Sequence, residues 1–82
     1  MTIWWASRAE RELAALDGAV RSRVLAALER FANTGAGDVK RLKGEVGTFR
    51  LRVGDWRIIF ALDAAREALH VQRVANRREA YR

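Results

Sequence analysis

Three arginines in the second half of the chain are spaced so that their side chains could meet on one surface. Arg50 and Arg52 lie in an alternating segment, 49–53, and Arg57 lies in a second one, 56–62. Because successive side chains of a β-strand point to opposite faces of the sheet, all three guanidinium groups are predicted to share a face. Guanidinium is planar, permanently charged and able to bind two phosphoryl oxygens at once. The spacing therefore predicts a sheet surface suited to phosphate.

The two segments are joined by Gly54-Asp55, a dipeptide typical of β-hairpin turns. The other face of this hairpin is predicted to be apolar, because hydrophobic residues occupy the alternate positions. The same alternation is also typical of an ordinary antiparallel sheet with one solvated face, which leaves a purely structural interpretation open. The apolar set is Phe49, Leu51, Val53, Trp56, Ile58, Phe60 and Leu62.

The positive charge of the chain is concentrated in its second half. Residues 1–39 contain five arginines and five acidic residues, whereas residues 40–82 contain eleven lysines and arginines and five acidic residues, and so carry the whole net charge of +6. Such a distribution is typical of surfaces that bind nucleic acid, but a solubilising surface or a site for an acidic protein gives it as well. The residues predicted to contact nucleic-acid phosphates are Lys40, Arg41, Lys43, Arg52 and Arg78.

Composition excludes several classes of protein. The chain has no cysteine and one histidine, His70, so disulfides and a metal cluster built on these residues are excluded. No run of about 18 apolar residues could span a membrane, and the N-terminal sequence lacks the apolar core of a signal peptide. We therefore expect a cytoplasmic protein in which residues 1–82 form a single domain.

The elements that must position the arginines begin with a short apolar strand, Thr2–Trp5. Ser7 and Glu10 are spaced as a capping box, which predicts the start of a helix. Asp17 is predicted to cap a second helix over 19–33, in which apolar residues recur at helical spacing.

After the second helix the sequence predicts a loop over 38–47, the hairpin, a third alternating strand over 68–75 and a short tail. The order is β-α-α-β-β-β. This order predicts an α+β fold in which two N-terminal helices pack on one face of a mostly antiparallel four-stranded sheet.

Three basic segments occur in a characteristic order: RLKG at 41–44, RLRVGDWRIIF at 50–60 and RVANRREAYR at 73–82. With the predicted element order, they resemble the RelE/ParE superfamily, the toxins of bacterial type II toxin–antitoxin modules. The most diagnostic part is the strand-end pattern V-x-x-R-R-x-x-Y-R, in which Asn76 stands where many relatives have histidine. The resemblance covers nearly the whole chain.

The resemblance to RelE-like members implies a toxin that inhibits translation as an endoribonuclease (an mRNA interferase) acting on mRNA in the ribosomal A site. In this reaction a ribose 2′-hydroxyl attacks the adjacent phosphorus, which leaves a 2′,3′-cyclic phosphate and a free 5′-hydroxyl. The reaction needs a base, cations that stabilise the phosphoryl oxygens, and an acid for the leaving oxygen, but neither a metal nor a cofactor. The implied partners are a cognate antitoxin, the ribosome and mRNA, and operator DNA bound through the antitoxin.

The resemblance also implies a catalytic set, formed by Arg50, Arg57, Arg77 and Tyr81. Arg57 matches the hairpin arginine that contacts the scissile phosphate, and Arg77 matches the arginine after the last strand. Tyr81 matches the tail tyrosine that stacks on the substrate base. Arg50 and Thr48 stand where family members have lysines.

These two departures leave the general base unassigned. Arginine, with a pKa above roughly 12, holds its proton too tightly to act as a base. Glu79 and His70 are the nearby alternatives, although Glu79 also suits a salt bridge and His70 a packed or surface position.

Other functions remain open. ParE-type members share the fold but inhibit DNA gyrase without nuclease activity, and they generally lack the arginine–tyrosine set. A degenerate toxin that serves as a binding partner and repressor subunit is a third reading. The tryptophans Trp4, Trp5 and Trp56 are expected in the core or facing a partner rather than as stacking platforms.

Overall fold

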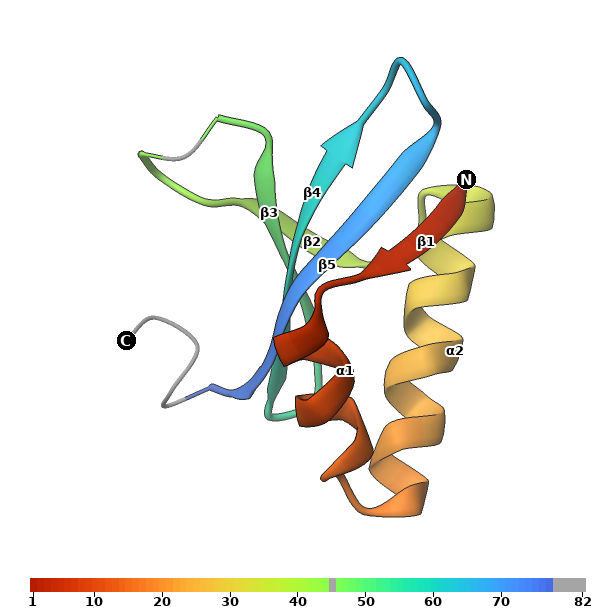
Figure 1. The fold of residues 1–82 in the computed structure, drawn as a ribbon, viewed down its shortest axis with the longest axis vertical. Coiled ribbons are helices and arrows are strands. Elements are labelled where there is room, and N and C mark those ends of the chain that lie inside the picture. Colours follow the sequence, from red (N-terminus) through yellow and green to blue (C-terminus); the bar gives the residue numbers. More distant parts are fainter. Residues whose placement is uncertain (45, 78–82) are drawn as a thin grey trace.

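The computed structural model describes residues 1–44 and 46–77, and this part contains two helices and one five-stranded sheet (Figure 1). The elements are β1 (Thr2–Trp5), α1 (Ser7–Ala14), α2 (Gly18–Thr34), β2 (Asp38–Arg41), β3 (Thr48–Val53), β4 (Trp56–Asp63) and β5 (Ala68–Asn76). The strand order is β1-β5-β4-β3-β2, with β1 parallel to β5 and the other neighbours antiparallel. The predicted α+β fold is confirmed. No helix of the described part is long and apolar enough to cross a membrane.

The expected number of strands, four, is wrong, because the predicted loop 38–47 begins with the edge strand β2. Val39 pairs with Leu51 and packs against the core, while its neighbours in β2 face outward. A four-residue strand with a single apolar position shows too little alternation to be recognised in the sequence.

The start of α1 also differs from the prediction. Ser7 is the first helical residue, and the N-cap is Ala6, which makes no side-chain cap hydrogen bond, so the predicted capping box of Ser7 and Glu10 is wrong. The N–H of Ala6 donates to the carbonyl of Val71 at 2.9 Å, and the N–H of Glu10 donates to the carbonyl of Ala6 at 3.0 Å. The parallel pairing of β1 with β5 therefore determines where the helix begins.

The second helix matches its prediction. The N–H of Ala19 donates to Asp17 Oδ2 at 3.2 Å, which is the expected cap. The helix ends at Gly35, whose φ of 76° is in the left-handed region that glycine adopts readily.

Both helices cover one face of the sheet (Figure 1), and the core lies between them and the strands. The predicted apolar face of the hairpin is confirmed, since all seven of its residues belong to the core or pack against it. The opposite face carries no helix, and we call it the open face. By strand alternation it includes Thr2, Trp4, Asp38, Lys40, Thr48, Arg50, Arg52, Arg57, Ile59, Ala61, Ala68, His70 and Ala75.

The free edge of β5 beyond Val71 is covered by α1. A bulge at this point leaves Gln72 without a partner on β4, because Ile59 pairs with Arg73 and Phe60 with Val71. Glu12 of α1 accepts hydrogen bonds from the N–H of Val74 at 2.9 Å and from Arg73 Nη2 at 3.0 Å. This carboxylate fixes the part of β5 that leads to the C-terminal segment.

Candidate phosphate-binding site

Two arginines stand directly opposite each other near the turn of the β3–β4 hairpin. Arg52 pairs with Arg57, and Ala75 of β5 is the other neighbour of Arg57. Neither of these neighbours is acidic. Like charges in directly opposed positions of a sheet destabilise it, so the fold by itself gives no reason for this pair.

Among residues 1–44 and 46–77, no acidic side chain forms an ion pair with the guanidinium of Arg57. Its Nε and Nη1 are buried and make no hydrogen bond in the structure. A buried donor without a partner costs about 1–3 kcal/mol, and a charged one costs more. An anion would satisfy one of these nitrogens together with Nη2, because Nε/Nη2 and Nη1/Nη2 are the two edges through which a guanidinium binds phosphate in a bidentate manner.

Arg50 is the third member of what we call the arginine cluster, which consists of Arg50, Arg52 and Arg57. It lies two residues from Arg52 on the same face of β3, about 7 Å away at the usual rise per residue. Its exposed fraction is 9%. Its Nη2 lies 3.6 Å from Oδ1 of the exposed Asp38, longer than a charge-assisted hydrogen bond of about 2.7–2.9 Å. This contact offsets the charge of Arg50 only in part.

The structure brings Arg77 to the same end of the sheet. The N–H of Arg77 donates to the carbonyl of Asp55 at 2.8 Å, and Asp55 lies in the hairpin turn. Nε of Arg52 donates to the carbonyl of the neighbouring Gly54 at 3.3 Å. The backbone therefore places the exposed Arg77 next to the cluster.

The predicted RNA-contacting residues are divided by the sheet. Lys40 pairs with Arg50 and shares its face. Arg41 lies on the helix side, where its Cζ is 5.9 Å from the ring centroid of Phe49, so it does not join the cluster. Lys43 is exposed in the loop that connects β2 and β3.

Several predicted residues lie outside the described part of the chain. They are Arg78, the candidate base Glu79 and Tyr81, so their assigned roles stay predictions. Thr48, at one of the family's lysine positions, is buried on the open face.

His70, the other candidate base, is exposed on the open face, but it pairs with Ala61, four residues from Arg57 on β4. That spacing corresponds to about 13 Å. His70 is therefore separate from the cluster. The described residues also contain no group of three His, Cys, Asp or Glu side chains placed as metal ligands. The cluster can bind a phosphate and stabilise its charge.

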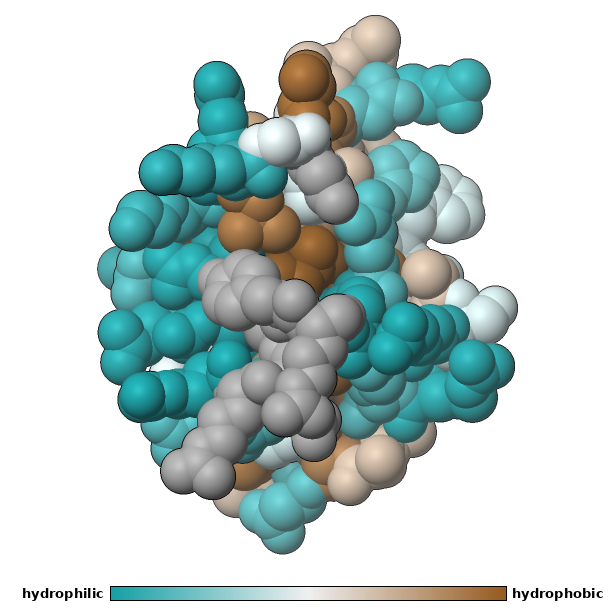
Figure 2. Space-filling view, turned by 90° about the vertical axis from the view of Figure 1, so that its left-hand side faces the viewer, coloured by the Kyte–Doolittle hydropathy of each residue, from teal (hydrophilic) through white to brown (hydrophobic). Residues whose placement is uncertain are grey.

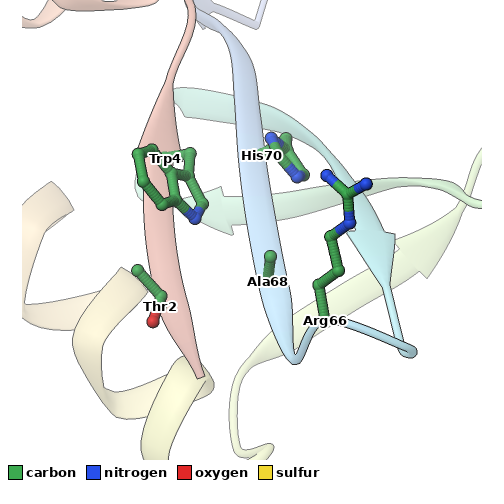
Figure 3. A pocket seen from close by; sticks show the side chains of 5 residues that line it. All are labelled: Thr2, Trp4, Arg66, Ala68 and His70. Carbon is green, nitrogen blue, oxygen red and sulfur yellow. The ribbon is translucent and has the colours of Figure 1, made fainter.

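The open face seen from the side opposite the helices has hydrophilic side chains along its borders (Figure 2). One part of this face was missed by the sequence analysis. A pocket of about 360 Å³ at the β1–β5 edge is lined by Thr2, Trp4, Arg66, Ala68 and His70 (Figure 3). These residues meet because β1 pairs with β5 in parallel, a long-range contact that no local pattern predicts.

Comparison with known proteins identifies similar proteins at the level of family and fold. The family model described as ParE toxin of type II toxin–antitoxin system, parDE, matches residues 3–81. No curated protein matches the sequence.

Solved structures resemble the chain over nearly its whole length. The RelB–RelE antitoxin–toxin complex from Methanococcus jannaschii is 24% identical, with a TM-score of 0.78 and coverage of 95% of this chain and 94% of the other. The RelE–RelB complex from Pyrococcus horikoshii OT3 is 20% identical, with a TM-score of 0.80 and coverage of 96% and 97%. The RelBE2 complex from Mycobacterium tuberculosis is 28% identical, with a TM-score of 0.66 and coverage of 92% and 88%. At these sequence identities, the structural similarity shows that the chain shares the fold of these proteins.

Proposed function

The chain belongs to the ParE toxin family of type II toxin–antitoxin systems, and from this premise we propose that it is a toxin that cleaves mRNA on the ribosome. The observation that carries the proposal is the state of Arg57. Its guanidinium is positioned by two neighbouring strands, faces a second arginine, and has two buried nitrogens without partners. A folded domain keeps such an arrangement at a cost in stability, which an anionic substrate would offset.

In the proposed reaction the scissile phosphate of mRNA occupies the arginine cluster. The 2′-hydroxyl gives its proton to a base as its oxygen forms a bond to phosphorus, the bond from phosphorus to the 5′-oxygen breaks, and the 5′-oxygen takes up a proton from an acid. Arg57 binds two phosphoryl oxygens, and Arg50 and Arg77 add positive charge as the oxygens become more negative. Tyr81 stacks on the base and so holds the nucleotide for attack. Neither a metal nor a cofactor takes part.

We also propose that a cognate antitoxin neutralises the toxin. The structures from M. jannaschii and M. tuberculosis are complexes of a toxin with an antitoxin, and the structure from P. horikoshii is a complex of RelE with RelB. A partly acidic antitoxin segment would complement the basic residues 40–82. Covering the arginine cluster would block the phosphate site, and the complex would bind operator DNA through the antitoxin.

Inhibition of DNA gyrase is the second candidate function. It is favoured by the family description, which names parDE, and by the threonine and arginine that replace two lysines of the nuclease members at positions 48 and 50. In this case the open face would bind protein, and the cluster would serve in recognition rather than in phosphoryl transfer.

The deciding experiment adds the purified protein to ribosomes programmed with a defined mRNA and maps new 5′ ends. A parallel assay follows DNA supercoiling by purified gyrase. The proposal predicts discrete cleavage that needs ribosomes, together with unchanged gyrase activity. Intact mRNA combined with inhibited supercoiling would establish the second candidate instead.

A further inference from the structure

The pocket at the β1–β5 edge is lined on one side by the exposed aromatic ring of Trp4. The exposed fraction of Trp4 is 56%, whereas Trp5 and Trp56 pack against the core. Trp4 pairs with His70, and Thr2 pairs with Ala68, so four of the lining residues come from two pairs of the parallel ladder that share a face, with the pair Ile3–Leu69 between them. The expected place in the core is thus confirmed for Trp5 and Trp56, and a partner-facing position of the exposed Trp4 stays a prediction.

The chemistry of this pocket combines a stacking surface with a cation. Ala68, a small buried residue, lies two positions before His70 on β5 and opposite Thr2, and its short side chain leaves room in the pocket (Figure 3). Arg66, from the turn before β5, directs its guanidinium toward the His70 side of the pocket (Figure 3). Its exposed fraction is 82%, and its contact with Asp63 is long, at 3.7 Å, so the guanidinium remains able to bind an anion.

The pocket also lies on the same face as the arginine cluster. His70 pairs with Ala61 of β4, the strand that carries Arg57. Ala61 and Arg57 are four residues apart, so the pair formed by His70 and Ala61 lies about 13 Å along the strand from Arg57 at the usual rise per residue. A single strand of nucleic acid with stacked bases covers this distance in roughly four nucleotides, at 3.4 Å for each. Aromatic rings beside basic side chains are the usual means of binding single strands.

We propose that this pocket is a second RNA subsite, which stacks one unpaired base on Trp4 and binds the adjoining phosphate through Arg66. The inference deepens the proposed function, on which it rests, by adding a contact about four nucleotides from the scissile phosphate. The ring of His70 would be the opposite side of the slot that receives the base.

The test measures the affinity of fluorescein-labelled single-stranded oligoadenylates of two to eight nucleotides by anisotropy. A 2′-O-methyl group at each position blocks the attacking oxygen and so prevents cleavage while the strand stays RNA-like. For the parent protein, affinity should rise sharply once the strand is long enough to reach from the cluster to the pocket. In Trp4→Ala this increase should disappear, a loss of roughly tenfold or more at eight nucleotides, as expected for one stacked base. Dinucleotide affinity should be unchanged.

Three variants define the cause of the effect. Trp4→Phe retains an aromatic ring and should keep most of the increase, which also controls for loss of folding. Arg66→Ala should reduce affinity for the long strand and lower its salt dependence. Val46→Ala, which removes an exposed apolar side chain in the β2–β3 loop, should match the parent.

The inference is overturned if affinity shows no dependence on length, or if Trp4→Ala binds the long strand as the parent does. It is also overturned if Trp4→Ala loses only its co-purification with the antitoxin, because the pocket would then be a protein site. Failure of the proposed function is distinguishable, since it appears as absence of mRNA cleavage on ribosomes while the length dependence is measured without ribosomes.

Discussion

Two arginines with buried guanidinium nitrogens lie on neighbouring strands of this sheet in opposite electrostatic surroundings. Arg73 of β5 faces the carboxylate of Glu12, which accepts from its Nη2 at 3.0 Å and also accepts from the N–H of Val74. Arg57 of β4 faces Arg52, and its Nε and Nη1 have no partners. Nε of Arg73 is unpaired as well, but its charge is offset by the carboxylate.

The difference shows how to separate a structural charge from a functional one. At the α1–β5 edge the charges are matched within the fold, and the interaction satisfies a backbone amide that the sheet leaves free. At the arginine cluster the charges are matched only in part within the described residues, by the contact of Arg50 with Asp38 at 3.6 Å, which is expected where the matching anion is a substrate.

The largest expected effect is on catalysis. Replacing Arg57 with alanine should lower ribosome-dependent cleavage by roughly 10²–10³, the usual loss on removing one preorganised charge-stabilising group. The measurement is the initial rate of appearance of the mapped 5′ ends. Arg23→Ala, which removes an exposed arginine from α2, is the control and should cleave as the parent does. Equal rates for Arg57→Ala and the parent would remove the phosphate site from the cluster.

Loss of the carboxylate that pairs with Arg73 should affect the stability of the fold rather than catalysis. Replacing Glu12 with alanine leaves Arg73 without its carboxylate and the Val74 N–H without an acceptor. The free energy of unfolding should fall by about 1–3 kcal/mol, measured by urea denaturation. The control is Glu29→Ala on the exposed side of α2, which should change stability by less than about 0.5 kcal/mol. If both glutamates are equally dispensable, Glu12 does not hold β5 in place.

The smallest expected effect separates two neighbouring residues of β2. Lys40 lies beside the cluster and Arg41 lies on the other side of the sheet. Affinity for a short RNA should fall linearly with the logarithm of salt concentration, and Lys40→Ala should reduce the slope by about 0.7, as for one phosphate contact with a single strand. Arg41→Ala should leave the slope unchanged. The same slope change in both variants would contradict the assignment of faces.

Features encoded over a few residues could be predicted from the sequence. The alternation around Gly54-Asp55 predicted the hairpin and the shared face of its arginines, and Asp17 was correctly placed as a cap. Features that depend on distant contacts could not be predicted. The capping box at Ser7 failed because the hydrogen bond from the N–H of Ala6 to the carbonyl of Val71 sets the helix start. Strand β2 was missed because one apolar residue, Val39, is too weak a signal.

The candidate site was predicted in its residue types more fully than in its geometry. The sequence predicted that Arg50, Arg52 and Arg57 share a face, but the lack of partners around Arg57 depends on register, which places Ala75 beside it. The pocket around Trp4 depends on the parallel pairing of the first and last strands, which local patterns do not encode.

The most direct test of the central claim replaces Arg57 with methionine and measures cleavage and unfolding on the same preparation. Methionine has a similar length but no charge, so it removes both the unpaired donors and the repulsion with Arg52. The account predicts that the free energy of unfolding stays the same or rises, while ribosome-dependent cleavage falls at least roughly 100-fold. A clear loss of stability with cleavage retained would show that Arg57 serves the fold rather than the phosphate, and would contradict the account.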